Sequence, residues 1–143
     1  ADMTWSETAM KESFYFSNMC PQNPGLNRGA WKDLEESIRK WVKKDSAIAI
    51  VCGPLVDKRD TTIGRNEVKI PHAFFKVIVS PYVTTPRGIG FVFKNEKEDA
   101  PLSAYVVSID SVEALTGMDF FSELPDELEN RLESQNNIFD WEL

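Results

Sequence analysis

The sequence has no long apolar run, no internal repeat and only two cysteines among its 143 residues. A bilayer-spanning helix needs roughly 18–20 consecutive apolar residues, so no membrane segment is expected. Cys20 and Cys52 do not follow the C-x-x-C spacing of metal sites. They form one disulfide in an oxidising compartment or stay as free thiols, and the free state is slightly favoured. No signal peptide is expected, and the start at Ala1 rather than Met suggests processing or cleavage.

Charge is distributed unevenly along the chain. The formal net charge of −7 argues against a polyanionic partner. Residues 123–143, however, hold seven acidic residues and one basic residue, so that segment carries −6 of the total. Basic residues gather instead in the segment that follows Asn27, namely Arg28, Lys32, Arg39, Lys40, Lys43 and Lys44. A locally basic helix beside an acidic tail is compatible with a phosphate substrate and does not by itself imply one.

Apolar periodicity and turn residues predict an α+β fold with a largely antiparallel sheet, in a single domain over residues 1–143. Asn27 stands directly before a run with apolar residues at helical spacing, which predicts a helix at about 28–44 with Asn27 as its N-cap. The aromatic segment 13–19 and the apolar segment 47–52 are expected to be strands, the latter central in the sheet. Further strands are expected at residues 68–70, 74–79, 88–93 and 102–108. Two more helices are expected at residues 111–116, with Ser111 as N-cap, and 125–134.

The segment from Ser17 to Arg39 contains the most informative polar residues. Glu35 is eight residues after Asn27, and Arg39 is four after Glu35, so all three lie on roughly one side of a helix. An amide oxygen suits Mg²⁺, which takes oxygen ligands and keeps several waters. A carboxylate can hold a metal-bound water, and a guanidinium can meet charge on phosphoryl oxygens. The same residues also fit plainer roles, with Asn27 as an N-cap and Glu35 and Arg39 as a solvated ion pair.

Several sequence blocks occur in the same order as in one known nuclease family. They are Ser-Phe-Tyr-Phe-Ser-Asn-Met-Cys-Pro-Gln (13–22), Leu-Asn-Arg-Gly-Ala-Trp (26–31), Leu-Glu (34–35), Val-Cys-Gly-Pro (51–54), Val-Lys-Ile-Pro-His-Ala-Phe-Phe-Lys-Val (68–77) and Leu-Thr-Gly-Met-Asp-Phe-Phe (115–121). On these blocks the chain resembles the C-terminal portion of the endonuclease G-like DNA/RNA non-specific endonucleases. The resemblance implies the ββα-metal, or His-Me finger, fold with its N-terminal strands missing from this chain.

The resemblance also implies an activity and a set of site residues. It implies hydrolysis of DNA and RNA with a single Mg²⁺, with Mn²⁺ as the alternative ion, and products with 5′-phosphate ends. Asn27 would be the metal ligand, Glu35 would orient metal-bound water, and Arg39 would stabilise the transition state. Asn18 matches a family asparagine that shapes the site. Family members are commonly dimers, which leaves a homodimer open, and the wording of the motifs suggests a secreted or periplasmic bacterial protein rather than a mitochondrial one.

The chain departs from the family pattern in one respect. The Asp-Arg-Gly-His motif, whose histidine is the general base, does not occur, and the sole histidine, His72, follows a strand-end proline and suits a structural role. An N-terminal fragment of the same enzyme is expected to supply the base, so this chain alone is expected to be inactive. The alternative is a catalytically inactive remnant that binds nucleic acid or protein. The fragment is favoured, because a fold without its early strands would expose an apolar edge.

Overall fold

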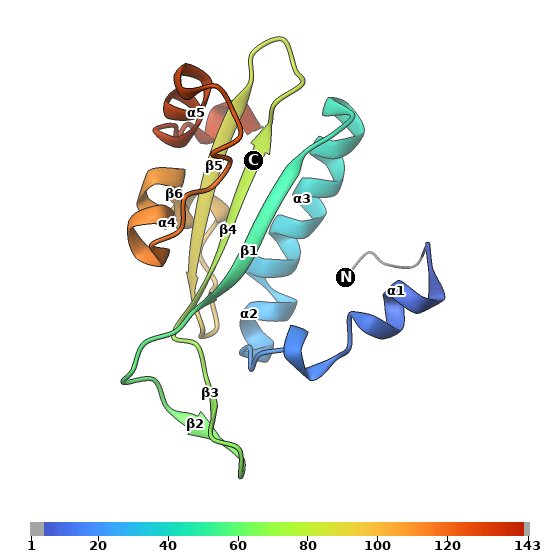
Figure 1. Ribbon diagram of the computed structural model, residues 1–143, viewed down its shortest axis with the longest axis vertical. Helices are drawn as coiled ribbons and strands as arrows, with labels where there is room; N and C mark the ends of the chain where they lie inside the picture. Colours follow the sequence, from blue (N-terminus) through green and yellow to red (C-terminus); the bar gives the residue numbers. More distant parts are fainter. Residues whose placement is uncertain (1–4, 142–143) are drawn as a thin grey trace.

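A computed structural model of the chain describes residues 5–141. Its centre is a four-stranded antiparallel sheet in the order β1-β4-β5-β6, made of β1 (Ala49–Leu55), β4 (Ala73–Ser80), β5 (Arg87–Lys94) and β6 (Val106–Val107). β4 is the most deeply buried strand, because an eight-residue run dominated by apolar side chains is covered on both faces. The α+β class and the largely antiparallel sheet are therefore confirmed (Figure 1).

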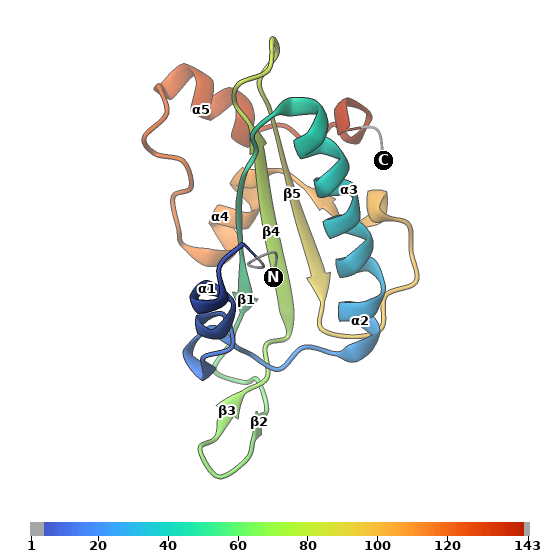
Figure 2. The same cartoon turned by 90° about the vertical axis from the view of Figure 1, so that its right-hand side faces the viewer.

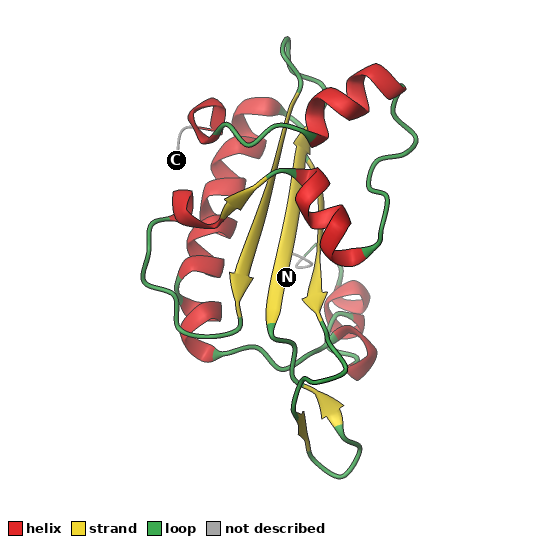
Figure 3. Ribbon diagram, turned by 90° about the vertical axis from the view of Figure 1, so that its left-hand side faces the viewer, coloured by secondary structure: helices red, strands yellow, loops and turns green. Residues whose placement is uncertain are grey.

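Helices cover the two faces of the sheet unequally. The long helix α3 (Ala30–Asp45) lies along one face, and the two short helices α4 (Ile109–Thr116) and α5 (Asp126–Glu133) lie on the other (Figures 2 and 3). The buried residues of α3 recur every three or four positions, which is the spacing of an amphipathic helix. Alternate residues of β4 divide between two apolar clusters, with Phe74 and Ile78 towards α3 and Val77 and Val79 towards α4 and α5.

The expected helix over 28–44 is interrupted near its start. A separate short helix, α2 (Pro24–Arg28), precedes α3, and Gly29 lies between them with φ −100° and ψ −121°. A Cβ atom at Gly29 would lie 2.7 Å from the carbonyl oxygen of Gly25, so a side chain would clash with backbone. Asn23 caps α2 by accepting a hydrogen bond from the Gly25 N–H at 2.7 Å. The prediction of Asn27 as an N-cap is therefore wrong: Asn27 lies in the last turn of α2.

The aromatic segment expected as a strand is mostly irregular. Helix α1 (Glu7–Glu12) comes first, and residues 13–19 then contain only the short 3₁₀ helix η1 (Phe16–Asn18). The large side chains here face solvent, and Phe16 is 92% exposed. Strand propensity reflects packing against neighbouring strands, and no described strand pairs with this segment. In Figure 1 α1 stands clear of the sheet, beside the edge formed by β1.

β1 also differs from the expected central strand. It continues through Gly53 and Pro54 to Leu55 and forms the edge of the described sheet, pairing with β4 alone. The charged segment after it forms a two-stranded hairpin from β2 (Thr62–Ile63) and β3 (Val68–Lys69), which projects below the sheet in Figure 1. An edge strand that contains a proline is usual, because proline has no N–H to donate to a second neighbour.

The C-terminal elements agree better with expectation. The strand expected at 102–108 is a 3₁₀ helix, η2 (Leu102–Tyr105), followed by the short β6. α4 begins one turn earlier than expected, because Ser108 rather than Ser111 caps it, and Gly117 ends it in the left-handed conformation with φ 69°. α5 matches the expected helix at 125–134, and a last 3₁₀ helix, η3 (Ile138–Trp141), returns to the side of α3, where Trp141 packs on Trp41.

Candidate functional site

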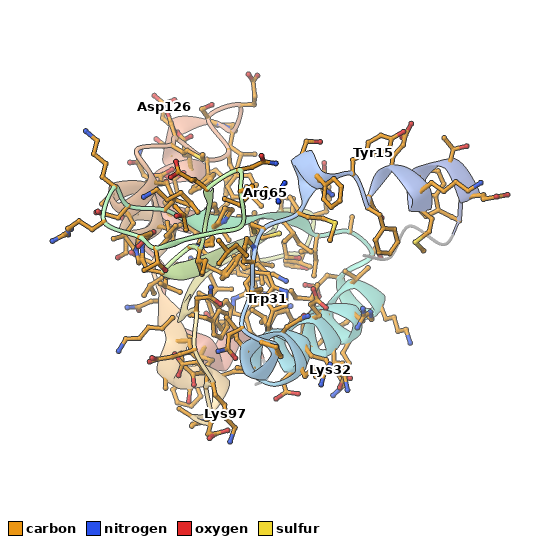
Figure 4. The ribbon with its side chains drawn as sticks, turned by 90° about the horizontal axis from the view of Figure 1, so that it is seen from below. Tyr15, Trp31, Lys32, Arg65, Lys97 and Asp126 are labelled. Carbon is orange, nitrogen blue, oxygen red and sulfur yellow. The ribbon has the colours of Figure 1, made fainter. Side chains whose placement is uncertain are left out.

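A buried lysine sits beneath the first turns of α3. Lys76 is the one charged residue of β4, and its side chain is only 5% exposed. Its Nζ lies 4.1 Å from the centroid of the Trp31 ring, a cation–π arrangement. The same ring packs edge-on against Phe74 and Phe93, with both centroids at 5.8 Å. Figure 4, which views the molecule from below, shows Trp31 between α3 and the sheet. The Trp31 indole and the Lys76 ammonium together form the floor of the candidate site.

Glu35 is held directly above this floor. One carboxylate oxygen, Oε1, accepts a hydrogen bond from the Trp31 indole N–H at 3.1 Å and lies 3.6 Å from the Lys76 ammonium. Burial lowers the pKa of Lys76, and the nearby Glu35 carboxylate opposes that change by favouring the charged ammonium. The side chain of Glu35 is 41% exposed, so the rest of the carboxylate remains open to solvent. The arrangement fixes one oxygen of a carboxylate that is partly exposed to solvent.

Arg39 lies one helical turn beyond Glu35 and belongs to the same electrostatic group. Its guanidinium is close enough to Lys76 to lower the pKa of that lysine, although less strongly than burial does. Glu35 also contacts Trp31 and Lys76, so the cluster extends beyond Glu35 and Arg39. A carboxylate and two cations are thus brought together on one side of α3.

A cavity of about 410 Å³ opens beside the cluster, between η1 and β1. Trp31 and Phe74 reach it from the floor, Asn18 lines it from η1, and Cys52 lines it from β1. The Asn18 amide donates to the Ser13 carbonyl at 3.1 Å, which fixes the orientation of its side chain. Asn18 and Trp31 therefore line the same cavity, and Trp31 in turn contacts Glu35 and Lys76.

The two cysteines face one another across the same region. Both are free and exposed thiols in the structure. Burial raises the pKa of the Cys20 thiol, and the neighbouring Cys52 adds to that rise. Of the two states that the sequence left open, a disulfide or two free thiols, the structure has the free thiols.

Asn27 is exposed at the end of α2, and it is not among the residues that line the cavity. α2 is fixed by Asn95, whose side chain accepts from the Asn23 N–H at 2.6 Å and donates to the carbonyls of Pro21 and Pro71. None of the described hydrogen bonds uses the Asn27 side chain, so its amide oxygen is available to an outside ligand. An exposed amide oxygen and a half-exposed carboxylate are hard donors of the kind that hydrated Mg²⁺ accepts. Each of the two residues therefore offers an oxygen donor of the type that suits such an ion.

His72 lies away from this cluster. Its Nδ1 is 3.0 Å from Asp60 Oδ2, at the join between the β2–β3 hairpin and β4. Sequence reasoning did not select Lys76, although a lone lysine inside an eight-residue apolar strand is itself a signal. Lysine is almost never fully buried unless it is paired, so such a position implies a partner from the covering helix.

Comparisons with known proteins identify the family of the chain. A family model described as DNA/RNA non-specific endonuclease matches residues 1–127. The chain belongs to that family. It is 32% identical to Nuclease 1, mitochondrial, of Schizosaccharomyces pombe over 87% of the chain and 44% of that protein. It is also 32% identical to human Endonuclease G, mitochondrial, over 84% of the chain and 45% of that protein.

A solved structure shares the fold as well. The crystal structure of the EndoG/EndoGI complex, described as showing the mechanism of EndoG inhibition, matches with a TM-score of 0.75 and 32% identity, over 84% of this chain and 55% of that one. The resemblance to endonuclease G-like nucleases and the ββα-metal fold are therefore confirmed. The chain spans less than half the length of the two relatives named above.

The comparisons correct one expectation. A secreted or periplasmic bacterial protein was expected, but both relatives named above are mitochondrial nucleases. A chain that is 32% identical to mitochondrial nucleases is not marked as bacterial by its family motifs. No helix among residues 5–141 combines the length and apolarity required to cross a membrane.

Proposed function

We propose that this chain is the C-terminal part of an endonuclease that hydrolyses DNA and RNA phosphodiesters with one hydrated Mg²⁺ and leaves 5′-phosphate ends. The observation that carries the proposal is the fixed Glu35 carboxylate, bonded to Trp31 and facing Lys76, beside a cavity that Asn18 lines. Asn27 would bind the ion through its amide oxygen, and Mn²⁺ would substitute for Mg²⁺. The bound ion supplies Lewis-acid stabilisation of charge on the phosphate oxygens.

The protein residues position water and substrate. The indole N–H of Trp31 and the Lys76 ammonium hold the Glu35 carboxylate in place, so that it accepts a hydrogen bond from a water and orients it. Arg39, exposed one turn further along α3, meets the negative charge that grows on the phosphate during attack. Phosphate contacts of this kind carry little base information, which accounts for activity on both DNA and RNA.

The proton of the attacking water needs a general base that the described residues do not provide near Glu35. His72 is engaged with Asp60. The unpaired edge of β1 supports a source outside this chain, because in the described part of the molecule that edge pairs with nothing. Exposed apolar side chains lie beside it, including Ile50 on β1 and Phe14 in the preceding segment. We infer that an N-terminal segment supplies strands for this edge together with the catalytic histidine, and that this chain alone does not cleave nucleic acid.

The relatives also bear on where the protein acts. Both named relatives are mitochondrial, and we propose the same compartment for the protein to which this chain belongs.

The test uses the full-length protein with supercoiled plasmid and single-stranded RNA in Mg²⁺. Asn27→Ala and Glu35→Gln are expected to lower kcat on the order of a hundredfold on both substrates, as loss of one transition-state group does in other enzymes. Glu36→Gln is the matched control, because Glu36 is the adjacent residue of α3, is exposed, and pairs only with Lys32 at 3.4 Å among the described ion pairs. Wild-type rates in Glu35→Gln would overturn the proposal. Binding without cleavage by the full-length protein would instead support a non-catalytic nucleic-acid-binding role.

A further inference from the structure

A second group of charged residues lies on the opposite face of the sheet from Glu35. Helices α4 and α5 stand next to one another there, joined by residues 117–125 (Figure 3). Five carboxylates converge from these three segments: Asp110 and Glu113 from α4, Asp119 from the connection, and Glu129 and Glu133 from α5. None of the functional residues described above belongs to this group.

The geometry of the group is compact, and Glu133 is at its centre. Oxygens of Asp110, Glu113 and Glu133 lie within 4.8 Å of one another, and so do oxygens of Asp119, Glu129 and Glu133. Both sets therefore share Glu133. Glu113 is additionally fastened to the connection, because its Oε1 accepts the Phe120 N–H at 2.7 Å.

Glu133 is also the least satisfied member of the group. Glu133 is only 7% exposed, and its Oε1 is buried without a hydrogen-bond partner. Oε1 of Glu129 is in the same condition. A buried carboxylate without a partner is strongly unfavourable when it is ionised. The described ion pairs include none of the five carboxylates, so no described lysine, arginine or histidine neutralises them.

A proton or a metal ion can relieve this arrangement. Burial and the four neighbouring carboxylates Glu113, Glu129, Asp110 and Asp119 together raise the pKa of Glu133 to about 7. Near neutral pH, protonation of Glu133 is therefore only partial. A divalent cation offsets more of the repulsion and satisfies the oxygens that lack donors.

We propose that Glu133 is the centre of a calcium-class divalent cation site formed by α4, α5 and their connection. Ca²⁺ takes six to eight oxygen ligands at about 2.3–2.6 Å, so two of its ligands lie no more than roughly 5 Å apart. The spacing of 4.8 Å or less within each set meets that condition. Mg²⁺ sites usually employ only one or two carboxylates, and zinc sites favour histidine and cysteine, so the oxygen-rich group suits calcium better.

The site has a structural consequence that is separate from hydrolysis. A bound ion would join the C-terminal half of α5 to the first turns of α4 and to the Asp119 segment, across a junction now occupied by like charges. The proposal does not depend on the nuclease assignment, because the two sites lie on opposite faces of the sheet and share no residue.

Calcium titration of the metal-free, full-length protein by calorimetry tests the proposal. The Asn27→Ala background removes the proposed hydrolytic metal ligand, so that binding there does not obscure the second site. In that background one Ca²⁺ is expected to bind, and Glu133→Gln is expected to weaken binding by on the order of tenfold or more. Glu127→Gln is the matched control, since Glu127 is an exposed residue of α5 outside the group, and it should bind as tightly as the background.

Two outcomes would overturn the proposal. One is the absence of calcium binding in the Asn27→Ala protein, which would mean that protonation alone relieves the group. The other is equal calcium affinity with and without Glu133→Gln. Glutamine resembles a protonated glutamate in shape, so the variant is expected to fold, and circular dichroism checks this. Glu129→Gln, which removes the other unpartnered oxygen, provides a second variant with the same expected direction.

Discussion

The end of α3 that is remote from Glu35 is fixed by an ion pair that should contribute strongly to stability. Asp45, the last residue of the helix, is 6% exposed. Its Oδ2 accepts from the Ser80 hydroxyl at 2.7 Å and pairs with Arg87 Nη2 at 2.6 Å. The Arg87 guanidinium also lies 4.6 Å from the Trp141 ring centroid. One arginine thus links α3, β5 and η3. We predict that Arg87→Met destabilises the protein far more than a charge change elsewhere on β5.

The expected magnitude follows from what the substitution leaves behind. Methionine keeps much of the volume of the arginine stem, and the Asp45 carboxylate then remains buried with only the Ser80 hydroxyl as partner. Removing one member of a buried ion pair costs about 3–5 kcal/mol. Loss of the contact with Trp141 adds about 0.5–1 kcal/mol. Partial relaxation of the exposed side of the site reduces the total, so a loss of about 3 kcal/mol is expected.

Urea unfolding of the full-length protein at pH 7, with the m-value compared between variants, measures this loss. Lys94→Met is the matched control, because Lys94 lies at the other end of β5 and pairs with Glu96 at 3.8 Å in an exposed position. An exposed pair contributes about 0–1 kcal/mol. Adding Asp45→Asn to Arg87→Met should recover part of the stability, since the stranded charge is removed. Equal losses for Arg87→Met and Lys94→Met, or no recovery in the double variant, would refute the reasoning.

Two further predictions concern the two titrating groups. Lys76→Met is expected to lower kcat about tenfold with little change in KM, because the ammonium orients Glu35 rather than touching substrate. Steady-state kinetics, with Glu36→Gln as the control, measure this, and an unchanged kcat in Lys76→Met would contradict it. For Glu133, the unfolded carboxyl titrates near 4.5 and the folded one near 7, so its contribution to stability is fully present below pH 4.5 and is lost as the pH rises through 7. After a discount for solvent screening, the free energy of unfolding of the metal-free wild-type protein should fall by about 1–2 kcal/mol relative to that of Glu133→Gln between pH 4.5 and pH 8. Urea unfolding of both proteins at the two pH values measures this, and an equal change in the two proteins would contradict it.

The sequence predicted best those elements whose signal is local and strong. The apolar run of β4 and the spacing of leucines in α5 each determine an element without reference to the rest of the chain. The end of α4 at Thr116 also agrees with the expected bound, and Gly117 follows it in the left-handed conformation, which glycine adopts at low cost.

The start of α2 was misread although its signal was present. Asn23 precedes a proline, and proline is favoured in the first helical turn, so Asn23 and Pro24 form a stronger start signal than Asn27 alone. As a result, Asn27 offers an exposed amide oxygen at the end of α2 and does not stand at a helix N-terminus. The break at Gly29, rather than a cap, turns the chain from α2 into α3.

Other features could not be read from this chain because they depend on distant partners. An aromatic run such as residues 13–19 becomes a strand only where another strand pairs with it. The role of Lys76 likewise depends on Trp31, which lies 45 positions earlier in the chain. Helical spacing placed Glu35 and Arg39 on one side of α3, but only the packing of α3 on β4 shows which cation fixes the carboxylate.

The distribution of charge over the fold removes the initial objection to a polyanionic substrate. The segment of α3 carries five basic and four acidic residues, whereas α5 carries four acidic residues and one basic residue. The two helices lie on opposite faces of the sheet, and Figure 4 shows Lys32 and Asp126 on opposite sides of the molecule. Charges separated by more than about 8 Å are largely screened at physiological salt. A phosphate chain that approaches the cavity beside Glu35 therefore meets the nearly balanced face of α3, and the net charge of −7 has little influence there.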